Sequence, residues 1–558
     1  MWVESLGAVL VAGFVMNFLF IIIFFFLPEN GIRVLVRSVG IEKGYTETSL
    51  SGFSQKKSES TKSPNIVFIF SDDHATNAIS AYGGIFKELA PTPHIDQIAS
   101  EGALLTNALC TNAICGPSRA AILTGKYSHI NGYYKNYKGG VFDSKQWTYP
   151  QELKKAGYQT ALVGKWHLAS EPVGFDYYKY HLSQGQQGLY WNPVYNDNGK
   201  KIKEKGYATN LTTDFAIDWL NGRKEKEPFC LMLQYKAPHR EWAPDTKYED
   251  LWDDIEMPYP ATFNDNYKGR ELTAGNTEMT MDYFSRKDMK MMPPDSLSKK
   301  ERGKWLRFGF KPGEIVAPSE DLSSEEIRKW KYQKYIKDYL ATIKSVDDNI
   351  GRVLEYLKAN GLEENTIVIY ASDQGFFLGE HGFFDKRFMY EEALRMPFII
   401  RYPGKIKPGT IVEDIVSNID FAPTLLEMAG IPVPEAVQGN SFFSNLKGKT
   451  PQDWRQSMYY HYYEYPFYHR VQPHYGIRNQ RYKLIHFYYD VDVWEFYDLQ
   501  NDPSEMNNLI NSDAHAGSID SLKTELYRLK KGYGNTMSLT ELRSISDTDF
   551  GGLESTKN

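Results

Sequence analysis

The stretch from Ile66 to Asp73 reads IVFIFSDD and determines the class of fold. It begins with a continuous apolar run rich in β-formers, which is typical of a strand that is buried on both faces. Polar residues follow the run at once, and the last two are carboxylates. Strands of this kind belong to parallel sheets, where ligands bind outside the carboxyl ends of the strands.

Similar apolar runs rich in β-formers recur along the chain and alternate with helical patterns. The clearest helix is expected to begin at Ser323, because Glu326 completes a capping box, and to end near Gly361. Alternating strands and helices predict an α/β fold with a mostly parallel sheet. The other expected strands are Thr160–Val163, Phe229–Leu233, Thr366–Tyr370 and Phe398–Ile400.

The C-terminal part of the chain has a different residue composition. Aromatic residues are crowded between Tyr459 and Tyr497, and Tyr482–Phe487 is expected to be a strand with mixed faces. We therefore predict a small C-terminal subdomain with an antiparallel sheet, and a large insertion between Asn264 and Pro318. The expected division is a hydrophobic segment with a polar linker at 1–63, a main domain at 64–450 and the subdomain at 451–558.

Length and charge narrow the function. The chain has 558 residues, which is enough for more than one domain and a large core. Its net charge is −6 and it has no long basic run, so nucleic acid is not an expected partner. Its three cysteines form no disulfide framework.

The segment from Ala8 to Leu27 is almost wholly apolar and long enough to span a bilayer. We predict an exported protein, periplasmic or at the cell surface, with this segment as an uncleaved membrane anchor or the core of a signal peptide. The polar stretch Ser49–Ser63 would be a tether. Glu4 before the segment and the basic residues after it, beginning at Arg33, favour the opposite orientation. A buried core helix is the alternative.

The expected strand at 366–370 also ends in polar residues, Asp373 and Gln374. Because the carboxyl ends of parallel strands meet at one edge of a sheet, these side chains should converge with Asp72 and Asp73. Three carboxylates and an amide oxygen form a hard oxygen site that suits Ca²⁺ and less often Mg²⁺. Taken singly, each pair is also consistent with a turn or a helix cap.

Cys115 begins the run CGPSRAAILTG, which ends at Gly125. Pro117 favours the first turn of a helix, so Cys115 should stand at a helix N-terminus, where an anion is stabilised. Arg119 is placed to turn back toward the same end. Most free cysteines are small buried hydrophobes, and this is the alternative for Cys115.

Three further motifs carry polar residues. They are GYQTALVGKWH from Gly157 to His167, KAPH from Lys236 to His239, and GEHGFFDKR from Gly379 to Arg387. Lys165 and His167 point the same way in an extended chain, because they are two residues apart. Histidine suits general acid–base work because its unperturbed pKa is near neutral.

Together with the cysteine run, these motifs resemble the signatures of the type I sulfatases, and the resemblance spans about Asn65 to Leu509. It implies an alkaline-phosphatase-like α/β core. It also implies that Cys115 is oxidised to formylglycine by a formylglycine-generating or anaerobic sulfatase-maturating enzyme, and that the hydrated aldehyde is the nucleophile. Gln374 departs from the family, which often has Asn there, but it still offers a carbonyl oxygen.

The resemblance implies roles for the remaining residues. Lys165 would bind the sulfate and the hydrate, His167 would act as a base on the hydrate, and His239 would be the general acid. Arg119 and Lys386 would neutralise the sulfate. The implied metal ligands are Asp72, Asp73, Cys115, Asp373 and Gln374, and the candidate substrate contacts are His381 and Arg387.

The run from Asp373 to Arg387 is most similar to bacterial sulfatases that act on sulfated polysaccharides, with some likeness to glucosamine-6-sulfatases. The expected substrate is therefore a sulfated polysaccharide or oligosaccharide. The sugar, the sulfate position and endo or exo action stay open. One alternative is a phosphatase or phosphodiesterase of the same fold, although these usually have Ser or Thr as nucleophile. The other is a non-catalytic carbohydrate-binding protein in which Cys115 stays a thiol.

Overall fold

A computed structural model describes residues 8–15, 18–27, 31–40, 63–136, 141–291, 293, 296–307, 322–466 and 468–550. Residues 1–62 and 63–558 form two separate compact units, and each is described by itself.

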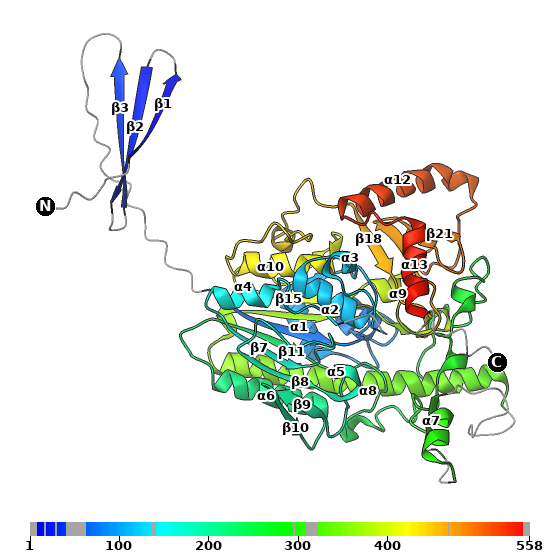
Figure 1. Ribbon diagram of the computed structural model, residues 1–558. Helices are drawn as coiled ribbons and strands as arrows, with labels where there is room; N and C mark the ends of the chain where they lie inside the picture. The colour runs from blue at the N-terminus through cyan, green and yellow to red at the C-terminus, as the bar shows by residue number, and fades with distance from the viewer. Residues whose placement is uncertain are drawn as a thin grey trace. The chain divides into compact units, whose positions relative to one another are not determined.

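A ten-stranded sheet forms the centre of the larger unit (Figure 1). Five neighbouring strands at its centre are parallel to one another, namely β8, β7, β11, β4 and β12. The strands β9, β10 and β15 outside them pair antiparallel. The prediction of a mostly parallel α/β sheet is confirmed. The order is β10 (Lys200–Lys203), β9 (Val194–Asp197), β8 (Tyr177–His181), β7 (Gln159–Gly164), β11 (Phe229–Gln234), β4 (Asn65–Ser71), β12 (Thr366–Ser372), β15 (Phe398–Arg401), β5 (Ala103–Leu105) and β16 (Thr410–Val412).

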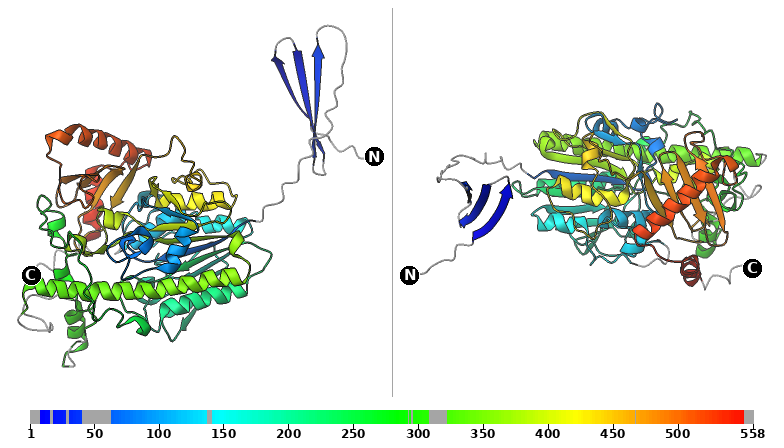
Figure 2. Two further views of the ribbon diagram at one scale, coloured as in Figure 1. Left: turned by 180° about the vertical axis from the view of Figure 1, so that it is seen from behind. Right: turned by 90° about the horizontal axis from the view of Figure 1, so that it is seen from above.

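Helices cover both faces of this sheet, which is why its central strands are continuously apolar. In β4, Val67 and Ile69 pack in one apolar cluster with α6 (Ala208–Asn221) and α8 (Ser324–Ala359). Phe68, on the other face of the sheet, packs in a second apolar cluster with helices α2 (Cys115–Thr124), α4 (Tyr149–Lys155) and α10 (Phe421–Met428). Figures 1 and 2 show α6 and α8 on one side of the sheet and α10 on the other.

The long helix α8 begins where the capping box predicts. Ser323 Oγ accepts a hydrogen bond from the backbone N–H of Glu326 at 3.3 Å, and Glu326 Oε2 accepts one from Ser323 N–H at 2.8 Å. The helix ends at Ala359, and Gly361 follows in the left-handed conformation with φ +64°. Both predicted ends are confirmed.

The C-terminal sheet is antiparallel, as predicted. Its four strands run in chain order, and Leu484 and Phe496 pack with Leu526 of α12. Its elements are β18 (Ser457–Tyr462), β19 (His474–Asn479), β20 (Tyr482–Phe487), β21 (Val493–Asp498), α12 (Ala516–Gly532) and α13 (Leu539–Phe550).

Short elements connect these parts. The described part of the predicted insertion holds two single-turn helices and α7 (Lys299–Arg307). Besides further single-turn helices, the other short elements are α1 (Pro93–Ser100), α3 (Ser128–Asn131), α5 (Ser183–Gln186), α9 (Glu391–Leu394), α11 (Phe443–Leu446), β6 (Ala108–Leu109), β13 (Phe377–Leu378), β14 (Phe384–Asp385) and β17 (Val416–Ser417).

The described residues of the N-terminal apolar segment form strands and not a helix. They are divided between β1 (Ala8–Val15) and β2 (Phe18–Leu27), which form an antiparallel sheet with β3 (Gly31–Gly40). The alternative of a buried core helix is therefore wrong. Across the described residues, we find no helix with the length and apolarity that a membrane crossing requires. Residues 49–62 of the predicted tether Ser49–Ser63 lie outside the described ranges. Export stays a prediction.

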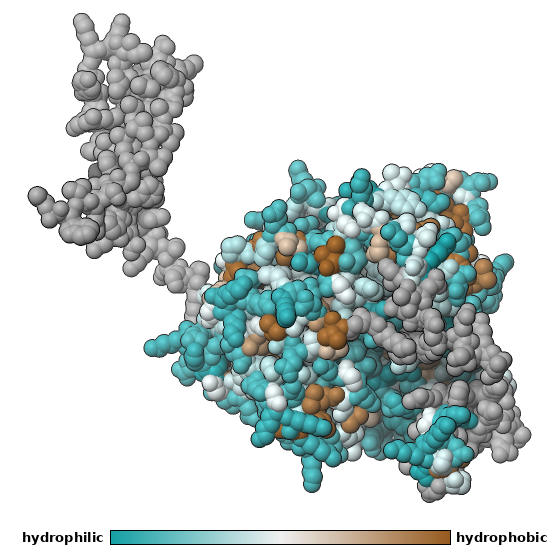
Figure 3. Space-filling view, in the orientation of Figure 1, coloured by the Kyte–Doolittle hydropathy of each residue, from teal (hydrophilic) through white to brown (hydrophobic). Residues whose placement is uncertain are grey.

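The face of the larger unit in Figure 3 is mostly hydrophilic. Its apolar side chains form small patches separated by polar ones. Single apolar side chains on a surface are ordinary in soluble domains. The described residues visible on this face therefore offer no broad apolar area for a partner.

We predict that Gly164→Ala destabilises the protein severely, because Gly164 has φ +115° and a Cβ there would clash with the backbone oxygen of Gln234. The expected loss in free energy of unfolding is more than about 4 kcal/mol. Gly157→Ala is the matched control, because its φ is +87° but a Cβ there meets nothing within 4 Å. It should cost only about 1–2 kcal/mol. Denaturant unfolding of both variants checks this, and equal losses would contradict it.

Candidate active site

Two neighbouring parallel strands deliver the acidic residues of the site. Asp72 and Asp73 follow β4, and Asp373 follows β12, which pairs with β4 in register up to Ser71 and Ser372. Carboxylate oxygens of the three aspartates lie within 4.8 Å of one another, and all three side chains are fully buried. The parallel pairing thus places three negative groups side by side at the carboxyl end of the sheet.

Three cations surround these carboxylates. Lys165, directly after β7, contacts Asp72 through its Nζ. Lys386 Nζ lies 2.5 Å and 2.6 Å from the two carboxylate oxygens of Asp73. Arg119, on the second turn of α2, donates from Nε to Oδ2 of Asp373 at 3.0 Å. Each buried carboxylate therefore has its own cation.

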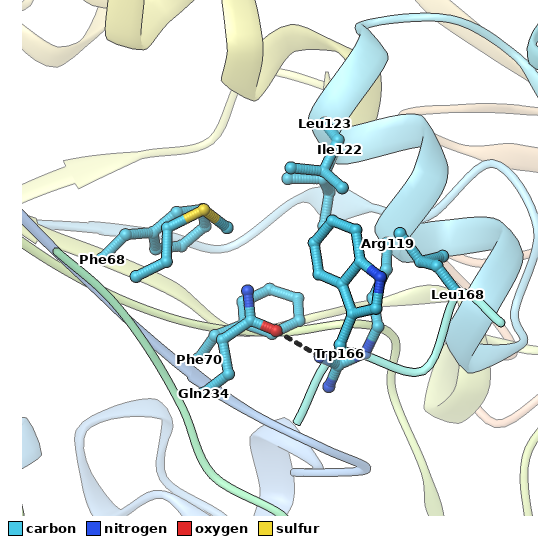
Figure 4. A pocket seen from close by; sticks show the side chains of 9 residues that line it. Phe68, Phe70, Arg119, Ile122, Leu123, Trp166, Leu168 and Gln234 are labelled. Carbon is cyan, nitrogen blue, oxygen red and sulfur yellow. Dashed lines mark hydrogen bonds between the residues drawn. The ribbon is translucent and has the colours of Figure 1, made fainter. Parts of the chain in front are cut away.

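The guanidinium of Arg119 is held from a second side. Its Nη1 donates to Gln234 Oε1 at 2.7 Å, the bond drawn in Figure 4, and to the backbone oxygen of Lys165 at 3.2 Å. Figure 4 also shows apolar side chains, among them Phe70 and Leu168, around this group. Few water molecules can screen a charge in such surroundings, so its attraction for anions is strong.

Cys115 is the first residue of α2 and is 1% exposed. Its Sγ lies 3.7 Å from Oδ1 of Asp73. Burial, and next the charge of Asp72, raise the pKa of the Cys115 thiol well above its usual value. An unmodified thiol here stays protonated at neutral pH and is a poor nucleophile, since the thiolate is the reactive form.

The carboxylates differ in their electrostatics. Burial alone raises the pKa of Asp72, but its cationic neighbours, Lys165 foremost, outweigh burial and hold the pKa well below its usual range. Burial raises the pKa of Asp73 to about 6 and that of Asp373 to about 7. The chain's own cations therefore only partly compensate the negative charges of Asp73 and Asp373.

Two histidines lie beside the cluster. His239 Nε2 is 3.7 Å from Oδ2 of Asp73, and its Nδ1–H donates to the backbone oxygen of Arg240 at 2.6 Å. His167 is 7% exposed and has a left-handed backbone with φ +56°. Burial lowers the pKa of both imidazoles well below the usual value. Both rings are neutral in the free protein.

The donor set fits a hard divalent cation. Gln374 Nε2 donates to Oδ1 of Asp73 at 2.5 Å, but Gln374 Oε1 and Asp72 Oδ1 are buried and accept no hydrogen bond from any described residue. Buried oxygens without donors are costly unless a cation binds them. Three carboxylates and one amide oxygen are the ligands that Ca²⁺ prefers.

The two candidate substrate contacts lie in different environments. Arg387, next to Lys386, is 5% exposed, and its Nη1 donates to Glu464 Oε1 at 2.7 Å. His381 is fully buried, and its Nδ1 lies 2.8 Å from Oδ2 of Asp265. His381 therefore faces Asp265, whereas Arg387 belongs to the segment that carries Lys386.

Sequence reasoning did not select several residues of this region. Gln234 is one polar residue at the end of an apolar strand, and only its place between β4 and β7 shows its importance. Arg240 directly follows the KAPH motif, and Asp385 directly precedes Lys386. Their proximity to known motifs was the available signal. Asp288, which binds Arg240, lies in the predicted insertion, and no sequence motif pointed to it.

Comparison with known families decides the identity. The model of the family described as Sulfatase matches residues 64–431. The chain belongs to the sulfatase family. As a member, this sulfatase is a sulfuric ester hydrolase. A second family model, described as N-sulphoglucosamine sulphohydrolase, C-terminal, matches residues 379–532.

Individual relatives agree. The sulfatase is 46% identical over 503 residues to N-acetylglucosamine-6-O-sulfatase of Bacteroides thetaiotaomicron, covering 87% of this chain and 89% of that one. It is 27% identical over 423 residues to human N-acetylglucosamine-6-sulfatase, covering 71% and 67%. A solved structure described as a complex with its substrate D-glucosamine-2-N,6-O-disulfate has 45% identity and a TM-score of 0.79, covering 85% and 99%.

Proposed function

We propose that this sulfatase hydrolyses the 6-O-sulfate ester of glucosamine residues in a sulfated oligosaccharide or polysaccharide. The 46% identical relative is named N-acetylglucosamine-6-O-sulfatase, and the 45% identical structure is described as a complex with its substrate D-glucosamine-2-N,6-O-disulfate. Both names contain a 6-O-sulfated glucosamine. The observation that carries the proposal in this chain is Cys115 at the N-terminus of α2, beside the three carboxylates and the three cations.

We propose that Cys115 acts as formylglycine, made by a formylglycine-generating or anaerobic sulfatase-maturating enzyme. The raised pKa of the thiol supports this, because a buried protonated thiol is a weak nucleophile. One hydroxyl of the aldehyde hydrate supplies the nucleophile, and the second permits release of sulfate. His167 is the proposed base for that release.

The proposed cation is Ca²⁺, with Mg²⁺ as the second choice. Asp72, Asp73, Asp373 and Gln374 would hold it together with residue 115. When bound, the cation neutralises the carboxylates and polarises a sulfate oxygen. The partly compensated carboxylates and the orphaned Gln374 Oε1 support its binding.

The chain's own residues then bind the sulfate and move protons. Arg119, Lys165 and Lys386 offset the charge that grows on the sulfate oxygens. His239 presents Nε2 to the cluster, and a bound anion beside this nitrogen favours the protonated ring. The protonated ring delivers a proton to the departing sugar oxygen. Arg387 is the proposed sugar contact. His381, the other candidate, is fully buried and faces Asp265, so we propose no direct substrate contact for it.

Export to the periplasm or the cell surface remains part of the proposal. The apolar segment Ala8–Leu27 supports it, since such a segment at the start of a hydrolase is typical of secretion. A membrane anchor is proposed on the same ground. Fractionation of cells that express the full chain tests both.

A phosphatase-like activity is the second candidate. A phosphonate monoester hydrolase from Silicibacter pomeroyi has a TM-score of 0.64 at 22% identity, which is a likeness of fold alone. The single cysteine in the nucleophile position favours the sulfatase. If Cys115 stayed a thiol, a carbohydrate-binding protein without turnover would be the remaining candidate.

We predict that Cys115→Ala and Cys115→Ser both abolish turnover of sulfate esters while the protein stays folded. Alanine lacks a nucleophile, and serine has one hydroxyl but not the second that release requires. Steady-state assays and thermal unfolding of both variants check this. Mass spectrometry of the peptide that contains residue 115 should show formylglycine in the active protein. Full activity of either folded variant would contradict the mechanism.

We predict one divalent cation per chain. Removal of metal with a chelator should abolish activity, and added Ca²⁺ should restore it and raise the melting temperature, since a cation that binds only the folded state stabilises it. Gln374→Met, which keeps the length but removes the amide oxygen, should weaken the shift. Gln184→Met on the partly exposed helix α5 is the control. Two tightly bound Zn²⁺ ions would instead favour the phosphatase.

We predict that His239→Ala lowers kcat on sugar sulfates far more than on an activated aryl sulfate. A sugar alkoxide needs a proton as it leaves, whereas a nitrophenolate does not. General acid catalysis is typically worth about 10²–10⁴-fold, so the difference should be plain. Parallel assays with both substrates measure it. An equal loss on both would assign His239 to sulfate binding.

A further inference from the structure

One backbone oxygen determines how His239 is oriented. The Nδ1–H of His239 donates to the carbonyl oxygen of Arg240 at 2.6 Å, and Lys236 Nζ donates to the same oxygen at 3.1 Å. With Nδ1 engaged, Nε2 is the nitrogen that faces the carboxylates, 3.7 Å from Asp73 Oδ2. The position of the Arg240 carbonyl therefore sets which nitrogen of His239 meets the substrate and at what angle.

The Arg240 side chain is fixed by a partner in the predicted insertion. Its Nε donates to Asp288 Oδ1 at 3.0 Å and its Nη2 to Asp288 Oδ2 at 2.6 Å, a two-point ion pair. Asp288 is 2% exposed and also accepts from Ser285 Oγ at 2.5 Å. Paired parallel hydrogen bonds hold a planar guanidinium in one orientation, which a single contact does not.

Arg240 also reaches the segment that carries Lys386. Its Nη1 donates to Asp385 Oδ2 at 3.1 Å and lies 3.0 Å from His469 Nε2. This contact uses a different nitrogen from the Asp288 pair. Loss of Asp288 therefore removes the two bonds at Nε and Nη2 that fix the orientation of the guanidinium and leaves it held at Nη1, beside Asp385 and His469.

We propose that Asp288 is a positioning residue for the general acid, acting through Arg240. By locking the Arg240 side chain, it fixes the backbone carbonyl of the same residue and so aims Nε2 of His239 at the leaving oxygen. Asp288 itself takes no part in the chemistry, because both of its oxygens are engaged by Arg240 and Ser285. This inference rests on the proposed function, in which His239 protonates the sugar oxygen.

The test is a double-mutant cycle on the ratio of kcat for a 6-O-sulfated glucosamine to kcat for a nitrophenyl sulfate. Asp288→Asn should lower this ratio about tenfold. In the His239→Ala background, Asp288→Asn should lower it no further, because the group that it positions is gone. Residues that act through one another are non-additive in this way, whereas independent structural losses add.

Asp420→Asn is the matched control. It breaks another buried Arg–Asp pair, with Arg455, whose Nη2 lies 2.7 Å from Asp420 Oδ1. The control should lose stability but keep the ratio. If Asp288→Asn does not fold, Arg240→Lys replaces it, since lysine keeps the charge but not the two parallel bonds. The same tenfold fall is expected.

Each outcome separates the hypotheses. An equal loss on both substrates, or a further fall in the His239→Ala background, would overturn the role of Asp288. An unchanged ratio in His239→Ala alone would overturn it too, because His239 would not be the acid. Failure of the folded wild type to hydrolyse the sugar sulfate would instead reject the proposed function.

Discussion

The rest of the active centre is built to compensate for three carboxylates buried together at the carboxyl ends of β4 and β12. Like charges this close cannot all ionise without cations near by. Arg119, Lys165 and Lys386 supply these cations from a helix, a strand end and a loop. Because burial still raises the pKa of Asp73 and Asp373, the chain alone does not complete the compensation. This uncompensated negative charge supports the divalent cation that we propose for the site.

The C-terminal sheet is part of this arrangement and not an appendage. The segment after Lys386 is bonded to it at two backbone positions: Tyr460 OH donates to the oxygen of Arg387 at 2.8 Å, and Met389 N–H donates to His474 Nε2 at 3.1 Å. Burial lowers the pKa of His474 to about 3, so its ring stays neutral and keeps Nε2 as an acceptor. The subdomain thereby fixes the loop that presents Lys386 to Asp73.

Much of this could be predicted from local patterns, and the exceptions have physical causes. The central strands were recognisable because burial on both faces leaves no polar position. The ends of α8 were recognisable because a capping box and a glycine act within a few residues. Asp288 and Arg240 were not, because they are 48 residues apart and neither stands in a periodic pattern. His381 stood in a promising motif, yet its backbone turns the ring toward Asp265.

The sequence by itself determined the type of most elements, the antiparallel character of the C-terminal sheet and the candidate residues of the site. These follow from side-chain periodicity, turn residues and short motifs, which report local burial and backbone conformation. Only the tertiary structure decided which cation pairs with which carboxylate, that Gln234 holds Arg119, and that Arg240 orients His239. Such contacts join distant segments, and their energies depend on distance and burial, which exist only once the sheet and its covering layers are assembled.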